Sequence, residues 1–248
     1  MSSPAVPLTI ADAALESFLG AYWDPAHFSP ALWDLAMDAC ERDGVHERLV
    51  HAVYDGVSAF ADTARWAQGC ARAYELTGLT RYLDRARELL GSSWDATGNG
   101  PAAIAAVKVY AATGDTSYLD RAQALYSRIR RQPRSENAGI YIGAATALYG
   151  VTRDGSYLSD ALSTADWVVT QPLTGDKAVL VRQLHRLAVE LGQPQYLPFL
   201  QHNADLAWRH RRTSDGLIGS DWSCRTPPGP LDSLTAAAGA ALLQIVAL

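Results

Sequence analysis

Apolar side chains recur at intervals of three and four residues along almost the whole chain, which is the spacing of amphipathic α-helices. Helix start and stop signals divide this pattern into about twelve segments. No run of alternating apolar and polar residues flanked by hairpin turns indicates a strand. The helices are expected at residues 10–21, 31–42, 45–58, 62–77, 80–91, 101–113, 116–130, 137–150, 155–170, 176–191, 194–211 and 231–247. The pattern therefore predicts an all-α protein.

These helices repeat in pairs. A Tyr-Leu dipeptide follows a short turn at four places, and its tyrosines, 36, 39 and 39 residues apart, are Tyr82, Tyr118, Tyr157 and Tyr196. A period in this range is typical of a repeated supersecondary unit, here a helix, a tight turn and a second helix. The residues at which the first helix of a pair must end are Gly78, Gly114, Arg153 and Gly192. The three glycines suit a left-handed C-cap.

Alternate helices differ in composition. Segments 62–77, 101–113, 137–150 and 231–247 are rich in Ala and Gly and nearly uncharged, which is typical of helices buried on most sides. Their partners, such as 80–91 and 116–130, carry charged residues on one face. We therefore predict a single (α/α)6 toroid over residues 1–248, with six uncharged inner helices and six amphipathic outer ones. The alternative is an open helical solenoid, which the dissimilar ends of the chain disfavour.

The inner helices of a toroid run parallel, so the loops leading into them gather at one end, where six helix N-termini create a positive potential. These leading loops are expected at residues 22–30, 58–62, 91–100, 131–137, 171–176 and 212–230. Five of the seven tryptophans lie in or just after them, namely Trp23, Trp33, Trp66, Trp94 and Trp222. Flat aromatic rings suit sugars or rigid apolar ligands. Packing of the core at this end of the ring explains them equally well.

Acidic residues lie in or beside the same loops. They are Asp24, Asp34, Asp62, Asp95, Glu136, Asp176, Asp221 and Asp232. An Asp at a helix start commonly acts as the N-cap, and we expect that role for Asp34, Asp95 and Asp232. Asp62 differs because Trp66 follows it by one turn in the middle of the predicted ring. Capping and a catalytic role are equally compatible with that position.

The composition narrows the possible functions. The 248 residues are 48% hydrophobic and carry a net charge of −5, with no basic stripe that would bind nucleic acid or an anionic membrane. Of the three cysteines, Cys40 and Cys70 lie in apolar helical patterns and are expected to be buried free thiols. The six histidines are scattered and form no metal-binding motif. We therefore predict no metal and no cofactor.

The expected location follows from what the sequence lacks. Residues 1–8 do not have the pattern of a signal peptide, and no stretch has the length and apolarity of a membrane span. An odd number of cysteines without a disulfide framework fits a reducing compartment. We expect a cytoplasmic protein that is a monomer or a weak homodimer.

Several segments, taken in order, resemble glycoside hydrolase family 76, the α-1,6-mannan-cleaving (α/α)6 toroids. Residues 62–67 and 73–78 look like the family's Asp-Asp-x-Ala-Trp-Trp-Ala segment and the turn after it. Trp94-Asp95 is similar to the family's Trp-Asp loop, and residues 137–143 are similar to its Asn-Gln-Gly stretch. Residues 203–208 and 219–222 resemble its last hairpin. The resemblance implies a toroid whose site lies at the inner-helix N-termini.

The departures from the family are informative. Its members use two adjacent aspartates, one as nucleophile and one as general acid/base, whereas here Ala61 takes the first place and only Asp62 remains. Retaining hydrolysis needs two carboxyl groups about 5–5.5 Å apart. Arg65 replaces the second tryptophan, so it could hold an anionic substrate, lower the pKa of Asp62, or point outward. The leading loops are also short, and family members are usually secreted.

Our first functional hypothesis is an intracellular enzyme of secondary metabolism that acts on a small molecule. Asp62 would be its general acid/base in a Trp-lined pocket, where burial would raise the pKa of the carboxyl. The reaction would be cyclisation, isomerisation, ring opening or hydrolysis. The residues expected to bind the substrate are Trp23, Asp24, Trp33, Arg65, Trp66, Trp94, Asn137, Tyr141, Asp176, Asp221 and Trp222.

Two alternatives remain open. The first is a true α-mannoside hydrolase, in which Asp62 is the acid and a second carboxylate about 6.5–9.5 Å away is the base. Asp24, Glu136, Asp176 and Asp221 are the candidates for that base. The second is a non-catalytic protein that binds a sugar or metabolite, which Ala61 favours.

Overall fold

The structure of the chain is a computed structural model that describes residues 9–24, 28–57, 59–93, 99–131, 133, 135, 137–173 and 175–246. Within these residues the regular structure is entirely helical, as the apolar spacing predicts. The helices are α1 (Ile10–Tyr22), α2 (Pro30–Asp43), α3 (Glu47–Gly56), α4 (Thr63–Thr77), α5 (Thr80–Ser93), α6 (Asn99–Thr113), α7 (Thr116–Ile129), α8 (Ala138–Thr152), α9 (Gly155–Val168), α10 (Lys177–Val189), the 3-10 turn η1 (Pro194–Tyr196), α11 (Leu197–Arg209) and α12 (Ser233–Val246).

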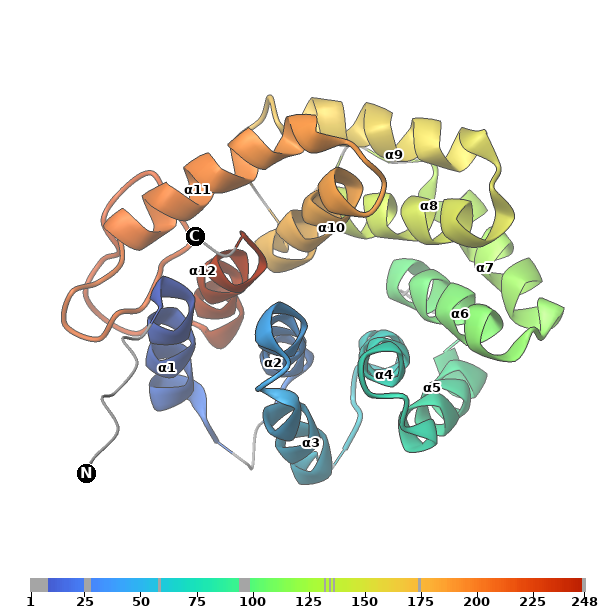
Figure 1. Ribbon diagram of the computed structural model, residues 1–248, viewed down its shortest axis with the longest axis horizontal. Coiled ribbons are helices and arrows are strands. Elements are labelled where there is room, and N and C mark those ends of the chain that lie inside the picture. Colours follow the sequence, from blue (N-terminus) through green and yellow to red (C-terminus); the bar gives the residue numbers. More distant parts are fainter. Residues whose placement is uncertain are drawn as a thin grey trace.

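The helices form two concentric rings. Helices α2, α4, α6, α8, α10 and α12 lie inside, and α1, α3, α5, α7, α9 and α11 lie around them (Figure 1). Each inner helix packs against the next, and α12 packs against α2, so the inner ring is closed. The prediction of an (α/α)6 toroid is confirmed, and the open solenoid is excluded.

The two ends of the described chain pack against each other, with α1 in the outer ring and α12 in the inner ring. Helix α1 packs against α12, whereas every other outer helix packs against the inner helix that precedes it in sequence. The Tyr22 hydroxyl donates a hydrogen bond to the Leu231 carbonyl oxygen at 2.8 Å. The buried Gln244 side chain donates another to the Ala11 carbonyl oxygen at 2.5 Å. The sixth hairpin is therefore assembled from opposite ends of the sequence.

The repeated turns have the predicted backbone conformation. Gly78, Gly114 and Gly192 have φ values of 69°, 73° and 65°, and Arg153 takes the same left-handed conformation with a φ of 59°. Arg153 is the one residue other than glycine with a positive φ in the described part of the chain. The tyrosine after the turn then anchors the outer helix, as Tyr196 shows: it is 1% exposed, and its hydroxyl donates to Asp166 of α9 at 2.8 Å.

Small residues let the inner helices approach closely. A Cβ atom added to Gly139 of α8 would lie 2.7 Å from the backbone nitrogen and Cα of Leu180 in α10. Real Cβ atoms essentially never come so near to another backbone, so no larger residue fits at this position. The Ala- and Gly-rich composition of the inner segments is thus explained by backbone proximity as well as by burial.

The inner ring is not uncharged, and the prediction of six uncharged inner helices is wrong for α2, α4, α6 and α10. Buried Asp38 of α2 accepts hydrogen bonds from Arg72 of α4 at 2.6 Å and from Arg182 of α10 at 2.6 and 2.7 Å. In the inner ring α12 separates α10 from α2. The ion pair between Arg182 of α10 and Asp38 of α2 therefore spans the space enclosed by the inner helices. Long arginine side chains fill central space that small residues leave, and each charge is compensated by a carboxylate.

We call this group of charges the central ion network. Its members are Asp34, Asp38 and Glu41 of α2, Arg65 and Arg72 of α4, and Asp176 and Arg182 at α10. Asp34 is predicted to be a helix N-cap, but this prediction is wrong because Ser29 caps α2 and Asp34 lies one turn further along the helix.

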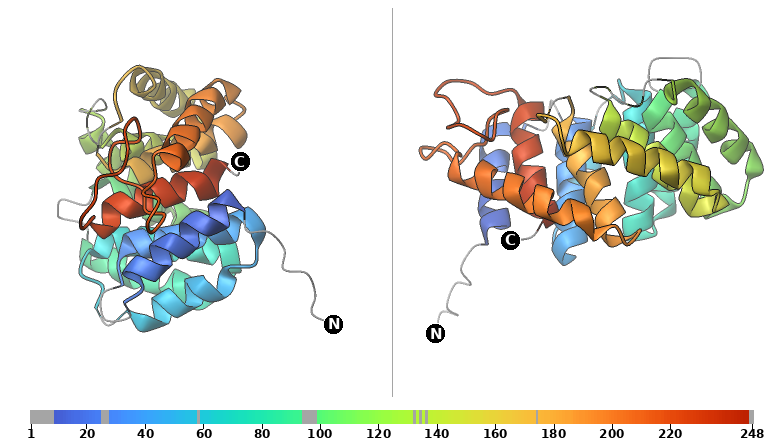
Figure 2. Two further views of the ribbon diagram at one scale, coloured as in Figure 1. Left: turned by 90° about the vertical axis from the view of Figure 1, so that its left-hand side faces the viewer. Right: turned by 90° about the horizontal axis from the view of Figure 1, so that it is seen from above.

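The inner helices begin at one end of the ring. Figure 2 shows that the described segment between α11 and α12, which leads into α12, projects from the body of the toroid. Among the described residues, no helix has the length and apolarity needed to cross a membrane.

Candidate functional site

Asp62 lies at the N-terminus of α4, exposed to solvent at the mouth of the ring. Its side-chain Oδ1 accepts a hydrogen bond from the backbone N–H of Arg65 at 3.2 Å, so the carboxylate caps the helix. Ala61, just before it, is also exposed. The sequence suggested a carboxyl enclosed by tryptophan rings and removed from water. In the structure the Asp62 side chain is exposed to solvent instead.

Arg65 points into the ring and bridges two carboxylates. Its Nη1 lies 2.6 Å from Asp176 Oδ2 at the start of α10, and its Nη2 lies 3.6 Å from Asp34 Oδ2 of α2. Burial disfavours the charged guanidinium, but Asp34 and Asp176 outweigh it and raise the pKa of Arg65. Asp176 also caps α10 by accepting from the Val179 N–H at 3.2 Å. This bridge occupies the centre of the ring just below the mouth.

Two of the predicted aromatic contacts lie in the hydrophobic core instead of on the rim. Trp33 and Trp66 are 1% and 2% exposed, and their ring centroids are 5.4 Å apart. The Trp33 indole N–H donates to the Val50 carbonyl oxygen at 2.9 Å, so its polar group is satisfied internally. Core packing is therefore the role that the structure gives both rings.

The remaining predicted residues are dispersed. Trp23 is 41% exposed and packs edge-on against Phe28 at the end of α1, beside the exposed Asp24. Tyr141 is buried against Tyr126 of the outer helix α7, with ring centroids 5.5 Å apart, so it faces away from the ring centre. Asn137 is exposed at the start of α8. Trp94, Asp95 and Glu136 lie outside the described residues.

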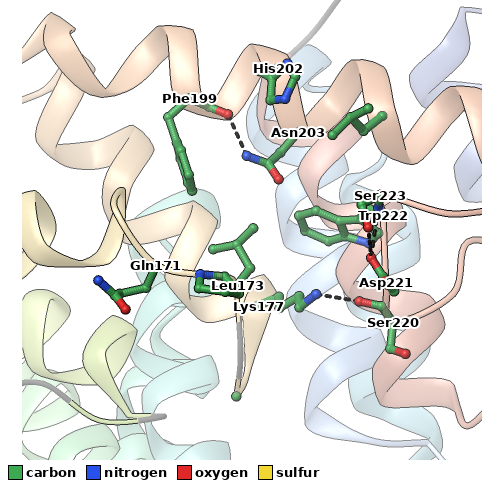
Figure 3. Close-up of a pocket in the computed structure, with 13 residues that line it drawn as sticks. Gln171, Leu173, Lys177, Phe199, His202, Asn203, Ser220, Asp221, Trp222 and Ser223 are labelled. Carbon is green, nitrogen blue, oxygen red and sulfur yellow. Dashed lines mark hydrogen bonds between the residues drawn. The ribbon is translucent and has the colours of Figure 1, made fainter.

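Asp221 and Trp222 do line a pocket, and its other walls were not predicted. The cavity has a volume of about 690 Å³ and lies between the loop leading into α10, the outer helix α11 and the loop before α12 (Figure 3). Its polar side chains include Gln171, Lys177, His202, Asn203 and Asp221, and its aromatic ones are Phe199 and Trp222. We call it the α10–α11 pocket.

Hydrogen bonds hold two polar side chains of the α10–α11 pocket, Asn203 and Asp221, in place. The Asn203 amide nitrogen donates to the Phe199 carbonyl oxygen at 2.8 Å, which turns its amide oxygen toward the space between Leu173 and Trp222 (Figure 3). Asp221 accepts from the backbone N–H of Ser223 at 2.9 Å and from its hydroxyl at 2.6 Å. These bonds lower the pKa of Asp221. Asp221 is therefore an ionised acceptor at neutral pH.

Lys177 and Trp222 form the inner corner of the pocket. The Lys177 amine donates to the Ser220 carbonyl oxygen and lies 4.9 Å from the centroid of the Trp222 ring. Burial lowers the pKa of Lys177, and the nearby Asp221 partly opposes that effect. Trp222 is 3% exposed, and its indole nitrogen is buried without a hydrogen-bond partner. An unsatisfied buried donor costs about 1–3 kcal/mol, so a ligand or water that accepted this N–H would be stabilised.

The pocket residues that were not predicted from the sequence include Lys177, Asn203 and His202, and only the first two of these had a sequence feature that could have indicated them. Lys177 directly follows the recognised Asp176 at a helix start, and Asn203 begins a segment that resembles the last hairpin of the glycosidase family. His202 gave no signal, because a single histidine on an outer helix has no motif around it. Only folding brings α11 beside the two loops.

The described residues contain one group that could ligate a metal ion, formed by Asp12, Asp43 and His46 on the surface. Both carboxylates already contact the Arg42 guanidinium. A cation there would have to compete with a fixed positive charge. The α10–α11 pocket does not include this group, so no metal enters the function proposed below.

Comparison with known proteins identifies solved structures that share the fold. No family model matches the chain, and no curated protein sequence matches it. Among solved structures, the chain is similar to an inactive variant of the α-1,6-mannanase GH76A of Salegentibacter sp. HEL1_6 in complex with α-1,6-mannotetraose. The TM-score is 0.85 at 22% identity, covering 96% of this chain and 98% of that one.

Two other solved structures share the architecture. The glycoside hydrolase family 76 mannosidase of Bacteroides thetaiotaomicron matches with a TM-score of 0.80 and 16% identity, covering 96% of this chain and 97% of that one. A polysaccharide lyase matches with a TM-score of 0.64 and 14% identity, with 96% of each chain covered. The protein is thus an (α/α)6 toroid. More specifically, it has the fold of the family 76 α-1,6-mannanases.

Proposed function

We propose that the protein binds a saccharide at the inner-helix N-terminal face without the retaining hydrolysis of a mannanase. The observation that carries this proposal is the state of the carboxylates at the mouth of the ring. Asp62 is exposed and follows Ala61, while Asp34 and Asp176 are both engaged by Arg65. A methyl group cannot act as a nucleophile, so the covalent intermediate of a retaining glycosidase has no residue to form on at position 61.

The inverting alternative is also poorly supported. It requires a carboxylate base that activates water, and such a base must be able to accept a proton near neutral pH. Asp176 is poorly placed for this role, because Arg65 at 2.6 Å and the Val179 N–H at 3.2 Å already occupy its carboxylate oxygens. Asp221 is similarly engaged by its hydrogen bonds from Ser223.

Binding without catalysis has a precedent in the fold. The Salegentibacter variant that was solved with mannotetraose is described as inactive, with two adjacent aspartates changed to alanine. In that protein, loss of the acid pair therefore left a complex with the oligosaccharide. Ala61 stands where, by the sequence resemblance, the first of those two acids would lie.

The α10–α11 pocket supplies the contacts that a sugar needs. A volume of about 690 Å³ lies within the roughly 300–1,000 Å³ typical of small-molecule sites. Amide, imidazole and carboxylate groups on its walls match the paired donors and acceptors of sugar hydroxyls. Phe199 and Trp222 offer apolar surface for the C–H faces of the ring. We propose this pocket as the main saccharide contact.

Titration calorimetry with α-1,6-mannotetraose tests the proposal, with chromatography of the same mixture as the assay for cleavage. We expect binding by the wild-type protein and no shortened oligosaccharide. Asn203→Ala should weaken binding about tenfold, the loss of one to two hydrogen bonds. Gln201→Ala, on an exposed position of the same helix, is the matched control and should bind normally. Cleavage of mannotetraose, or no heat with any mannose oligomer, would refute the proposal.

A second candidate is the acid/base enzyme acting on a small molecule, and the retained Asp62 at the mouth of the ring favours it. Asp62→Asn is the appropriate variant, because Asn keeps a side-chain oxygen that can cap α4 but cannot transfer a proton. Assays of cyclisation, isomerisation, ring opening and hydrolysis against a small-molecule library would identify a substrate. Unchanged turnover in Asp62→Asn would exclude the proposed role of Asp62.

A further inference from the structure

A second, smaller pocket lies at the opposite end of the ring. It has a volume of about 200 Å³ and is formed near the C-terminal ends of α4, α6, α8 and α10. Its charged lining consists of Glu75, Lys108, Arg186 and Glu190, and α8 contributes Gly143, Thr146, Ala147, Gly150 and Val151, none of which titrates. We call it the Lys108 pocket. It is separated from the α10–α11 pocket by the length of the inner ring.

The cations of the Lys108 pocket lie deeper than its carboxylates. The Lys108 side chain is 9% exposed and forms an ion pair with Glu75, whose side chain is 41% exposed. Arg186, 27% exposed, donates to Glu190 at 3.1 Å, and the Glu190 side chain is 60% exposed. An anion entering from solvent would therefore meet two flexible surface carboxylates and then a positive interior. Surface carboxylates that can swing into water do not block such a site.

The surroundings of Lys108 show that its positive charge is not fully compensated. Burial lowers the pKa of its amine to about 8, and the repulsion from Arg186 adds to that shift while Glu75 opposes it. Arg72 contributes in the same direction. A bound anion beside the amine would remove this electrostatic cost.

The choice of residue type is also informative. The chain contains two lysines against nineteen arginines, and both lysines, Lys108 and Lys177, line a pocket. Arginine remains charged in any protein environment, whereas a buried lysine can release its proton near neutral pH. An arginine at position 108 would keep its charge but would also place a larger planar group in a small cavity. Lysine leaves room for a ligand.

We propose that the Lys108 pocket binds a small organic carboxylate, with the carboxylate between Lys108 and Arg186 and an apolar tail against Ile104, Val107 and Val151. The volume equals that of roughly seven water molecules in the liquid, which admits a short-chain acid and excludes an oligosaccharide. The apolar walls disfavour inorganic phosphate, which has no group to place against them. The site is independent of the saccharide function proposed above.

Reductive methylation of the native protein with formaldehyde provides a direct test, because the chain has only two lysines to resolve by peptide mass spectrometry. We expect millimolar butyrate to slow the methylation of Lys108 and to leave Lys177 unaffected, so Lys177 is an internal control. Butanol, which has the same tail without the charge, should protect neither lysine. Phosphate should protect Lys108 less than butyrate does. Equal protection of both lysines, or none at Lys108, would overturn the proposal.

Variants give a second measurement by calorimetry with butyrate. Arg186→Met should weaken binding about tenfold through loss of a charge-assisted hydrogen bond. Glu75→Gln should strengthen binding, because it removes the carboxylate that competes for Lys108. Affinity in the wild type should fall as pH rises through about 8, where the amine loses its proton. Lys177→Met should bind butyrate normally, and a loss there as large as in Arg186→Met would contradict the assignment.

Discussion

Asp38 has no exposed side-chain surface, and two arginine side chains that are themselves nearly buried surround it. Taking three charges out of water costs several kcal/mol for each ion before the mutual attraction is counted. The arrangement persists because every contact is short and because Arg72 also reaches Glu41 at 2.7 Å. A buried ion group of this kind is costly to break rather than a large source of net stability.

Removal of one partner from this group should be strongly destabilising. We expect Arg182→Met to lower the free energy of unfolding by about 3 kcal/mol, because it leaves the buried Asp38 with a single cation. Urea denaturation followed by circular dichroism measures the change. Arg87→Met is the control, because that side chain is half exposed and its ion pair with Asp84 is 4.0 Å long, so its effect should be much smaller. Equal effects of the two substitutions would show that the central ion network is not a stability determinant.

The sequence could not predict which charges lie inside the ring. Arg72 and Arg182 have the same local context as charges on a solvated helix face, and only ring closure brings them to Asp38. The same limit applies to the α10–α11 pocket, whose His202 and Gln171 come from segments far apart in sequence. Asp62 was placed correctly at its helix start because capping is a local property.

Helices and their turns were predictable because their signals are local. The four repeated turns were located from Gly, Arg and the Tyr-Leu dipeptide, and all four have the left-handed conformation at the expected residue. Helix boundaries coincide with those expected or differ from them by at most three residues, which is close to the usual variation at frayed ends. Contacts between helices, such as that between Gly139 and Leu180, depend on the three-dimensional packing. The sequence contains no unambiguous sign of them.

Arg153 offers a simple test at this scale. A residue other than glycine in the left-handed region is strained by about 1 kcal/mol, and Arg153→Gly should therefore stabilise the protein by up to that amount. Loss of the cation–π contact with the Tyr149 ring, at 5.8 Å, offsets a small part of the gain. Arg153→Ala loses the same contact and keeps the strain, so it is the matched control. Thermal melts should rank Arg153→Gly above the wild type and Arg153→Ala below it.

Two glycines of α8 should respond in opposite ways to alanine. Gly139→Ala places a Cβ 2.7 Å from the α10 backbone and should destabilise the protein by about 2–3 kcal/mol through forced separation of the two helices. At Gly150 nothing lies within 4 Å of an added Cβ, so Gly150→Ala should stabilise by about 0.5–1 kcal/mol through helix propensity. Chemical denaturation of both variants checks the pair. If Gly139→Ala were as stable as Gly150→Ala, the two inner helices would not be in close contact.

The charge pattern makes the stability of the whole molecule sensitive to acid. Burial alone would raise the pKa of Glu41, but the Arg72 guanidinium outweighs it and holds the pKa at about 2, below the ordinary 4.5. A depressed folded-state pKa contributes stability that is present above pH 4.5 and is lost as the pH falls toward 2. The melting temperature should therefore drop between pH 6 and pH 3. In Glu41→Gln the drop should be smaller, and an equally large drop would assign the acid sensitivity to other carboxylates.

Pairing of α1 with α12 has a consequence for biosynthesis. A ribosome makes α1 first, yet the inner helix against which α1 packs is completed only when residues 233–246 leave the exit tunnel. The apolar face of α1 must stay exposed, or be shielded by a chaperone, while nearly all the rest of the chain is synthesised. Each other hairpin can form as soon as its own two helices have emerged. Closure of the ring therefore comes after the other hairpins have emerged, and a circularly permuted gene in which α12 directly precedes α1 would allow that hairpin to form first.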